Sequence, residues 1–557
     1  MKFSEIRYER VDFEKANEKM RAFAKAQREA KTFEEAFKVH TEKTKYYDHL
    51  VTMVTVAQIR HDIDTTDEFY EKEQDYIDEM LPTTNESTIE YSKALYETPF
   101  RKEFEEKLGK VAFKNLELQL DYFKPEMVPL MQEENALTTR YAKLLATAKI
   151  DWEGETLNLS LMTKYTTDPD REIRKKAFAK TTGFFMDNRD ELDEIYDKLV
   201  KCRTKQAKIL GFDTFTKLGY ARMNRNDYGP DEVKAFREEV KKKIVPLASK
   251  IHEARRKRIG VDHLYYYDTI FFKNGNPVPD GTPEEILENG RKMYEELSPE
   301  TGEFFNFMLS NERFDVIGRK TKKTGGYMTT LPDDDNTPFV FANFNKTAGD
   351  VDVITHECGH AFQGYITRKD CSEYRNITME TAEIHSMSME FFTEPWMEKF
   401  FGDRADDYRV YHLADAVTFI PYGCMVDEFQ HIIYENPDLT PAERRAEWVK
   451  LEKQYRPHMD YGDNEYYLSG GFWQRQLHIY ELPFYYIDYC LAQTVALEYK
   501  AWMEKDYKEA WNSYLEFCKQ GARDFYSKSL PKVGLKVPVE KGCLDEMVEI
   551  LEKTMEL

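Results

Sequence analysis

The stretch from Asp352 to Tyr365 reads DVITHECGHAFQGY and contains the pattern His356-Glu357-Cys358-Gly359-His360. Residues four apart lie one turn above each other on the same face of a helix, so two imidazoles can hold one metal ion from a rigid element. An H-E-x-x-H pattern is typical of a zinc site in which the glutamate, here Glu357, takes a proton from the metal-bound water. Catalytic zinc usually has three protein ligands and one water. The pattern therefore predicts one Zn²⁺ per chain and a third ligand downstream.

The alternative interpretation of this motif is a chance match on an ordinary amphipathic helix with solvated charges. The flanking residues Val353, Ile354, Ala361 and Phe362 are apolar, which predicts a buried helix instead. Buried polar side chains need partners, and burying them without partners costs free energy. A buried helix with two histidines and one glutamate is therefore better explained by a metal site.

A second helical stretch, from Thr378 to Phe392, supplies candidates for the third ligand. Its residues Glu380, Glu383 and Glu390 are separated by three and seven positions, so they lie near one face of a helix. A carboxylate on that face would complete a His-His-Glu zinc site, and Glu383 is central on it. One of the two neighbouring glutamates is expected to orient a ligand imidazole. His385 points elsewhere and is expected to be a core or supporting histidine.

Composition limits the partners and the compartment. The formal net charge of −22 argues against nucleic acid and anionic membranes, because phosphates would be repelled. The charged first residues lack the apolar core of a secretory signal, and no stretch approaches the ~20 apolar residues of a transmembrane helix. The seven cysteines include no C-x-x-C pair, which is typical of reduced thiols. These features predict a cytoplasmic protein.

Most of the chain has helical periodicity. Residues 13–125 are expected to form helix after helix, and we divide the chain into an N-terminal helical region, 1–170, and a catalytic helical region, 171–557. A small hairpin is expected around Glu153-Gly154. Helices are expected to resume at Asp170 and to stop near Val245, just before Pro246. A later helical region is expected to be interrupted at Pro421.

Two β-prone runs precede the motif, from Gly325 to Leu331 and from Thr337 to Phe344. They predict a small sheet, at about residues 325–345, that lies beside the metal helix. An edge strand of such a sheet could hydrogen-bond the backbone of an extended peptide, or the pair could be a purely structural hairpin. Both interpretations remain open at this point.

The motif and its surroundings resemble the thimet oligopeptidase family, and most closely its oligoendopeptidase F or Pz-peptidase branch. The likeness rests on His-Glu-x-Gly-His, on Glu383-Ile-His-Ser386 followed by Glu390, and on Pro483-Phe-Tyr-Tyr-Ile-Asp-Tyr489. It covers roughly residues 325–500. The resemblance implies that His356, His360 and Glu383 bind zinc and that Glu357 is the general base. Cys358 fills a variable position and is not expected to act as a nucleophile.

The resemblance also implies a histidine and tyrosines that hydrogen-bond the oxyanion formed when water attacks the peptide carbonyl. By position these are His478 and Tyr486, with Tyr485 and Tyr489 as alternatives. The residues by themselves, without the resemblance, would place these aromatics in the core. The preceding stretch, Arg456–Trp473, is rich in Gly, Asp, Asn and aromatic residues and is expected to be a mobile loop over a cleft.

The expected fold is therefore mainly α, a zincin-type metallopeptidase with a small β-sheet beside the metal helix and a deep channel between two helical halves. The expected function is zinc-dependent cleavage of internal bonds in short peptides, by a monomer or small homo-oligomer that binds neither nucleic acid nor membrane. A zinc carboxypeptidase or dipeptidyl carboxypeptidase would use the same ligands plus a group for the substrate's C-terminal carboxylate. Candidates for that group are Arg456, Arg475 and the basic runs at 241–243, 255–258 and 320–323. A non-catalytic peptide-binding scaffold is the third alternative.

Overall fold

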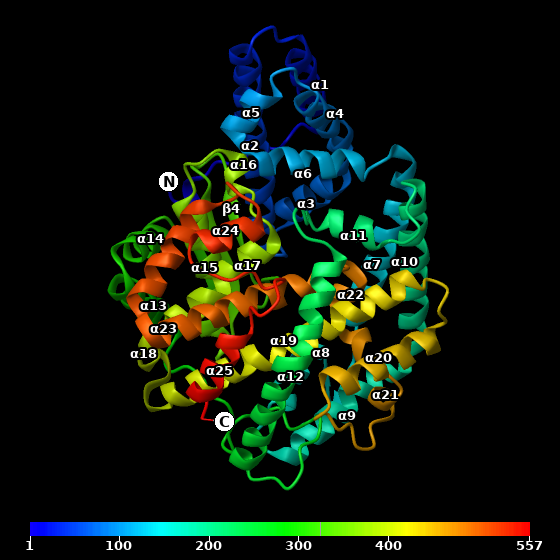
Figure 1. Ribbon diagram of the computed structural model, residues 1–557, viewed down its shortest axis with the longest axis vertical. Helices are drawn as coiled ribbons and strands as arrows, with labels where there is room; N and C mark the ends of the chain where they lie inside the picture. Colours follow the sequence, from blue (N-terminus) through cyan, green and yellow to red (C-terminus); the bar gives the residue numbers. More distant parts are fainter. Residues whose placement is uncertain (324, 557) are drawn as a thin grey trace. The chain divides into compact units, whose positions relative to one another are not determined.

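The computed structural model describes residues 1–323 and 325–556, and it confirms a mainly α fold (Figure 1). About 70% of the chain is helical, and the strands form small sheets. Many helices begin where the sequence supplies a capping side chain: Asp12, Thr32 and Asp170 each accept a hydrogen bond from a backbone N–H of the first turn. Within the described residues no helix is long and apolar enough to cross a membrane.

The contacts divide the chain into two compact units that alternate along the sequence. Unit 1 comprises Met1–Asp121, Pro277–Ala405 and Trp502–Leu535. Unit 2 comprises Tyr122–Asn276, Asp406–Ala501 and Lys536–Leu557. The functional division expected at residue 170 stays a prediction.

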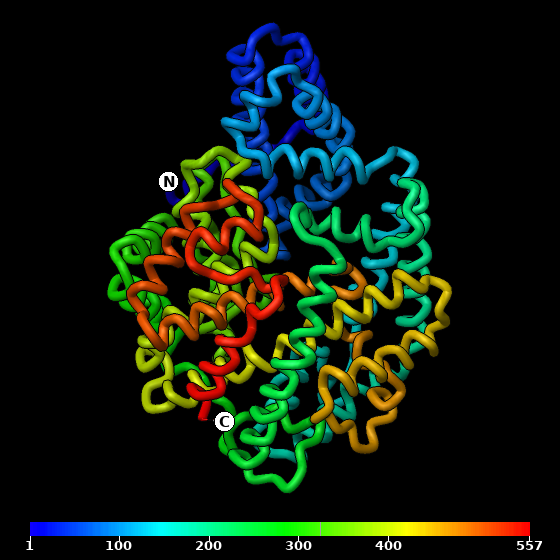
Figure 2. Tube along the Cα trace, viewed as in Figure 1, coloured from blue at the N-terminus to red at the C-terminus, as the bar shows by residue number. Residues whose placement is uncertain are grey.

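Unit 1 contains the helices of the first 121 residues, those between residues 283 and 401, and α24. Figure 2 traces its first part in blue, where α1 packs against α4 and α2. The helices are α1 (Phe13–Glu29), α2 (Phe33–Ile63), α3 (Glu68–Met80), α4 (Asn85–Tyr96), α5 (Arg101–Leu108), α6 (Lys110–Asp121), α13 (Pro283–Leu297), α14 (Pro299–Ser310), α15 (Gly349–Ile366), α16 (Ser372–Arg375), α17 (Met379–Phe392), α18 (Glu398–Phe401) and α24 (Tyr526–Lys532).

A three-stranded sheet in unit 1 supports α15. Its strands are β3 (Phe314–Ile317), β4 (Tyr327–Leu331) and β5 (Thr337–Phe344), in the order β3-β5-β4. β5 is central and almost wholly buried, antiparallel to β4 and parallel to β3, and α15 packs on it. The sheet predicted beside the metal helix is confirmed. The sequence analysis missed β3, which is only four residues long.

Unit 2 is also helical and carries the predicted hairpin. Strands β1 (Ile150–Trp152) and β2 (Glu155–Leu157) pair through Glu153 and Gly154, both with positive φ, as a tight hairpin turn requires. The helices are α7 (Val128–Ala146), α8 (Leu159–Thr166), α9 (Arg171–Asp187), α10 (Arg189–Ile209), α11 (Thr216–Arg222), α12 (Pro230–Ile259), α20 (Pro441–Tyr455), α21 (Glu465–Leu468), α22 (Leu477–Glu481) and α25 (Asp545–Thr554).

Two helices continue from one unit's sequence into the other's, and short 3₁₀ helices join several elements. α19 spans Ala405–Glu435, and α23 spans Tyr486–Gln520 with a kink at Asp506, whose φ of −153° is not helical. The 3₁₀ helices are η1 (Phe3–Glu5), η2 (Leu81–Thr84), η3 (Pro125–Met127), η4 (Glu394–Trp396), η5 (Gly402–Arg404) and η6 (Phe472–Arg475).

Two expected helix breaks were wrong. α12 runs through Pro246 and α19 runs through Pro421. A proline inside a helix removes one backbone hydrogen bond and crowds the preceding turn, which is a local cost. In both helices the residues around the proline are buried, so tertiary packing outweighs that cost. α12 ends at Gly260, which takes the left-handed conformation with φ of 74°.

The stretch Arg456–Trp473, expected to be a loop, is folded around its aromatic residues. It contains α21 and the start of η6, and Tyr461, Tyr466, Tyr467 and Trp473 are buried. These side chains lock the segment into unit 2. Its expected role as a mobile lid stays a prediction.

Candidate metal centre

The metal centre is built on two helices of unit 1, α15 and α17, that lie side by side (Figure 1). They approach closely at Gly359, where an added Cβ would lie 2.6 Å from Ser386 Cα and 2.7 Å from the carbonyl oxygen of His385. Only glycine fits there. The glycine of the H-E-x-G-H pattern therefore allows α17 to bring Glu383 within reach of both histidines.

The structure brings the three expected ligands together. Ligand atoms of His356, His360 and Glu383 all lie within 4.8 Å of one another. His356 Nε2 is 3.5 Å and His360 Nε2 is 3.6 Å from the same oxygen, Glu383 Oε2. Two imidazole nitrogens and one carboxylate oxygen converging on a point form the donor set of a catalytic zinc site.

The chemistry of these donors fits a divalent cation. Glu383 is only 4% exposed, which would normally raise its pKa. Burial does act in that direction, but hydrogen bonding and charge from His356 and His360 hold the pKa of Glu383 well below its usual range. The carboxylate is therefore held charged in a buried place, where a metal ion would satisfy it.

Glu390 orients the first ligand. Its Oε1 lies 2.6 Å from His356 Nδ1, so the Nδ1 proton is donated to Glu390 and Nε2 is left to face Glu383. Of the two neighbours of Glu383 on α17, Glu390 is thus the glutamate that contacts a ligand imidazole. His385 is 1% exposed and packs against Phe517 and Cys518, as expected for a core histidine.

Glu357 follows His356 on α15 and differs from the other acidic groups near the centre. Among the described residues its carboxylate has neither a hydrogen-bond nor an ion-pair partner, and it is half-buried. Its oxygens are therefore not engaged by another side chain. The adjacent Cys358 is fully buried, and burial raises the pKa of its thiol well above the usual value, which disfavours the thiolate form.

The expected oxyanion donors lie in unit 2, where they contact one another. The His478 ring centroid is 5.0 Å from that of Tyr486, 5.6 Å from Tyr485 and 5.9 Å from Tyr489. Burial raises the pKa of Tyr486 well above its usual value, so its phenol stays protonated and can donate. The cluster leaves all three tyrosines as candidates.

Gln476 determines which nitrogen of His478 carries the proton. Tyr422 donates its hydroxyl hydrogen to Gln476 Oε1 at 2.7 Å, and Gln476 Nε2 lies 2.9 Å from His478 Nδ1. An amide nitrogen only donates, so Nδ1 accepts and the proton of the neutral ring is on Nε2. His478 is therefore presented as an Nε2–H donor. The sequence analysis missed Gln476, because no spacing rule links it to His478.

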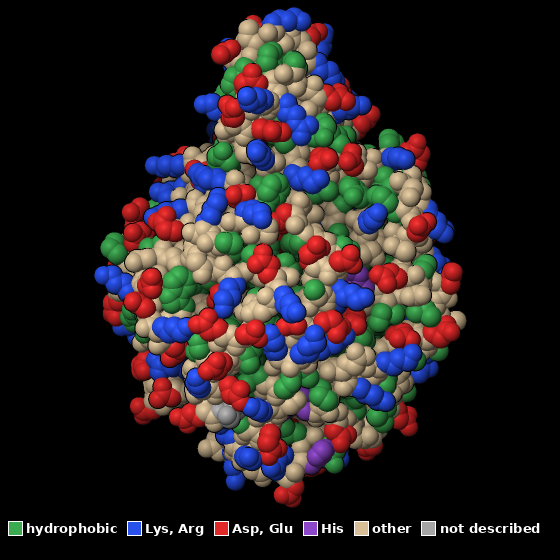
Figure 3. Space-filling view, in the orientation of Figure 1, with side chains coloured by type: hydrophobic (Ala, Val, Ile, Leu, Met, Phe, Trp, Pro, Cys, Tyr) green, Lys and Arg blue, Asp and Glu red, His purple; other side chains and the backbone are tan. Residues whose placement is uncertain are grey.

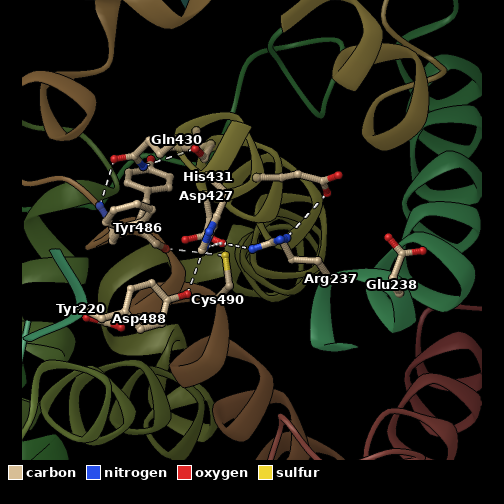
Figure 4. A network of polar contacts seen from close by, with 12 residues as sticks. Tyr220, Arg237, Glu238, Asp427, Gln430, His431, Tyr486, Asp488 and Cys490 are labelled. Carbon is tan, nitrogen blue, oxygen red and sulfur yellow. Dashed lines mark hydrogen bonds and ion pairs between the residues drawn. The ribbon is translucent and has the colours of Figure 1, made fainter. Parts of the chain in front are cut away.

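The turn before the tyrosines is strained and supported by distant residues (Figure 4). Phe484 is buried with φ of 69°, a left-handed conformation that non-glycine residues rarely adopt. Gln430 Oε1 accepts from the Phe484 N–H at 2.9 Å, and Arg225 donates to the Phe484 carbonyl and, at 2.7 Å, to Asp488. Gly219 leaves room for the ring, since a Cβ there would lie 2.5 Å from it.

This support extends into a buried polar network on α19. Arg237 forms an ion pair with Asp427, and Tyr220 shares a 3.0 Å hydrogen bond with His431 Nε2 (Figure 4). Partners for these buried groups come from helices far apart in sequence, so no local motif could have identified them. They fix the start of α23, from which Tyr486 and Tyr489 project.

A mainly helical chain in which an H-E-x-x-H helix and a glutamate converge on one point has the features of a metallopeptidase, and known proteins identify its family. Residues 3–123 match the Peptidase M3 N-terminal domain, and residues 164–280 and 298–549 match Peptidase family M3. The oligopeptidase PepF of Bacillus subtilis (strain 168) is 22% identical over 555 residues, covering 92% of this chain and 80% of PepF.

Solved structures agree over the whole chain. A Pz peptidase A structure with an inhibitor is 46% identical, with a TM-score of 0.93, and covers 100% of this chain and 99% of that one. A structure named as an oligoendopeptidase F from Bacillus anthracis is 42% identical, with a TM-score of 0.89, and covers 100% and 98%. The chain belongs to peptidase family M3. It is an oligopeptidase of that family, as the sequence resemblance predicted.

Proposed function

We propose that the protein is a zinc-dependent endopeptidase that hydrolyses internal bonds of short peptides. The observation that carries the proposal is the convergence of His356 Nε2, His360 Nε2 and Glu383 Oε2, beside the unpaired carboxylate of Glu357. One zinc ion per chain would be held by these three side chains, with His356 oriented by Glu390. When bound, zinc supplies Lewis acidity that polarises the scissile carbonyl and lowers the pKa of water.

Glu357 is the proposed general base. Because its carboxylate has no other partner among the described residues, it can take the proton of the attacking water at one of its oxygens. The same oxygen then delivers that proton to the nitrogen of the leaving amine. Glu357, His356 and His360 share α15, so the base and the two histidines are held by one rigid element.

The negative charge that develops on the carbonyl oxygen needs donors that are already oriented. We assign these roles to His478, through Nε2–H, and to Tyr486, through its hydroxyl, with Tyr485 and Tyr489 as alternatives. Removing one such donor from an enzyme typically costs about 2.7–4 kcal/mol of transition-state stabilisation. Gln476 acts through His478 by holding its tautomer.

The substrate backbone is the proposed partner of the sheet. β4 is an edge strand whose residues are mostly half-exposed, next to α15. An extended peptide could add to this edge through main-chain hydrogen bonds, which ignore most side-chain identity.

A cytoplasmic location fits this role, and all seven cysteines are free thiols. A monomer or small homo-oligomer remains the expected assembly, without nucleic-acid or membrane partners.

Glu357→Gln tests the role of the base. The amide cannot accept the proton, so kcat is expected to fall by about 10²- to 10⁴-fold while one zinc per chain is retained. Kinetics with an internally quenched peptide and metal analysis of the same sample measure both quantities. Glu303→Gln is a matched control, because Glu303 accepts a 2.9 Å hydrogen bond from Tyr365 of α15 but is not part of the centre. Turnover by Glu357→Gln close to that of the control would exclude Glu357 as the base.

Cleavage position separates the endopeptidase from a carboxypeptidase. A peptide blocked at both ends is expected to be cut at an internal bond, which mass spectrometry of the products identifies. Trimming of unblocked peptides alone, one or two residues at a time from the C-terminus, would instead support the carboxypeptidase alternative.

A further inference from the structure

Arg475 is one of several arginines in this protein that have no carboxylate partner among the described residues. On the face shown in Figure 3 basic and acidic side chains are interleaved, and surface arginines such as Arg140 and Arg291 form ion pairs with glutamates at 2.6–3.4 Å. Arg475, in η6 of unit 2, has no carboxylate within ion-pairing distance among the described residues. Its polar neighbours are the phenols of Tyr467, Tyr422 and Tyr466, and the residue is nevertheless exposed.

A second arginine lies against the same aromatic ring. The guanidinium carbon of Arg475 is 5.1 Å and that of Arg456 is 5.0 Å from the centroid of Phe472, and Arg456 is also 5.4 Å from Tyr422. These distances are typical of cation–π contacts. A guanidinium held over a ring keeps its plane fixed while the N–H donors at its edge remain available, which suits two-pronged binding of a carboxylate.

The positive charge of Arg456 has a single carboxylate beside it, that of Glu452. Arg456 Nη1 lies 3.5 Å from Glu452 but makes no hydrogen bond, and Glu452 also accepts from the Tyr461 hydroxyl. Nearby His458 stacks on His252 with ring centroids 3.5 Å apart. Burial, and then the charges of Arg456 and Arg255, lower the pKa of His458 to about 3. This imidazole is therefore neutral and adds no charge next to the two arginines.

The arginine pair is linked to the proposed oxyanion donors. Tyr422, whose ring contacts Arg456, donates to Gln476, and Gln476 bonds to His478. Arg475 itself precedes His478 by three residues. Anything held by the two arginines would therefore lie in the same part of unit 2 as the groups assigned to the reacting carbonyl.

We propose that Arg475 and Arg456, held on Phe472, form a binding site for a carboxylate of the peptide substrate. The carboxylate is either the C-terminus or an acidic side chain of the peptide. The site selects among peptides by charge, in contrast to the backbone pairing proposed for β4, which is indifferent to sequence. This inference rests on the proposed peptidase function, and its test measures binding so that it does not depend on turnover.

The test uses three peptides in complex with the zinc-loaded Glu357→Gln protein, measured by isothermal titration calorimetry. The peptides share one N-blocked sequence and end in a free acid, in an amide, or in an amide with glutamate as the last residue. At least one carboxylate-bearing peptide is expected to bind about tenfold more tightly than the plain amide, as charged hydrogen bonds usually provide. Which of the two binds identifies the source of the carboxylate.

When Arg475→Gln is introduced into the Glu357→Gln protein, the preference for the carboxylate-bearing peptide is expected to fall to less than about twofold. Arg475→Lys in the same background should retain part of this preference, because lysine keeps the charge but not the planar fork. Lys453→Gln is the matched control, an exposed cation three residues before Arg456. It should keep the full preference. Equal binding of all three peptides, or a preference that survives in Arg475→Gln, would overturn the proposal. Loss of zinc or of cleavage without a change in this preference would instead count against the peptidase mechanism alone.

Discussion

The metal centre of unit 1 and the donor cluster of unit 2 are assembled in opposite ways. His356, His360 and Glu383 project from two regular helices, and a spacing of four residues places the two histidines on one face. His478 and Tyr486 instead flank a short irregular segment in which Phe484 has a positive φ. The segment is supported by four residues distant from it in the sequence, Gly219, Arg225, Gln430 and Tyr422.

This difference predicts how sensitive each group of residues is to substitutions outside it. A ligand set on packed helices should be disturbed only by changes at the ligands or where the helices touch. A donor set on a strained turn should be sensitive to residues that never contact substrate. Variants in the two regions should therefore separate metal binding from turnover.

The largest effect is expected from removing the carboxylate ligand. Glu383→Ala leaves two imidazoles to hold the ion, so the purified protein should contain far less than one zinc per chain and show no measurable turnover. Metal analysis and peptide cleavage on the same preparation check this. Full zinc content would show that another group is the third ligand.

Two glycines give a matched pair of tests in the two units. Gly359→Ala pushes a Cβ into the backbone of α17, and Gly219→Ala pushes one into the ring of Phe484. Each is expected to lower the free energy of unfolding by about 1–3 kcal/mol through overpacking. Gly359→Ala should also contain less zinc per chain, whereas Gly219→Ala should keep its zinc content and show a lower kcat.

Gly183→Ala is the control for both, because a Cβ added at Gly183 in α9 would meet no atom within 4 Å. Alanine should be neutral there or stabilise by up to about 1 kcal/mol. Thermal unfolding, metal content and steady-state kinetics of the three variants provide the comparison. Zinc loss in Gly219→Ala would contradict the separation of the two regions.

Glu390→Gln should have a smaller effect at the metal. The amide oxygen can still accept from His356 Nδ1, but the charge that makes the imidazole a better ligand is lost. Zinc affinity is expected to fall about 10- to 100-fold, measured by competition with a chelator. Glu303→Gln, the control used above, should leave affinity unchanged; an equal loss there would indicate a general electrostatic effect.

The smallest effect is expected at Gln476, and its sign depends on the substitution. Gln476→Met removes the donor to His478 Nδ1 and should lower kcat about fivefold, the value of one hydrogen bond. Gln476→Glu would attract the proton to Nδ1 and raise the pKa of His478. Below that raised pKa the imidazolium still carries Nε2–H, and above it the neutral ring does not. The kcat of Gln476→Glu should therefore fall as pH rises, and a pH profile matching the parent would exclude the tautomer role.

The same contrast explains what the sequence could and could not predict. Helix periodicity predicted the mainly α fold, two β-prone runs predicted the sheet beside α15, and the H-E-x-x-H spacing singled out His356 and His360, because these depend on local geometry. Glu383 was singled out by its central place on the face of a second helical stretch and by the family resemblance. Glu390 emerged only as one of two candidates. The helix breaks predicted at Pro246 and Pro421 were wrong, because packing of the buried residues around each proline outweighs its local cost. Gln476 and the residues that hold Phe484 were missed because no local pattern connects them to the groups that they support.

The central claim is tested most directly by metal content together with cleavage of an internally quenched peptide blocked at both ends, before and after chelation. We expect one zinc per chain, internal cleavage that is lost on chelation, and recovery when zinc is returned. Cleavage that persists after the metal has been removed, or a protein that binds no metal and cleaves nothing, would contradict the account.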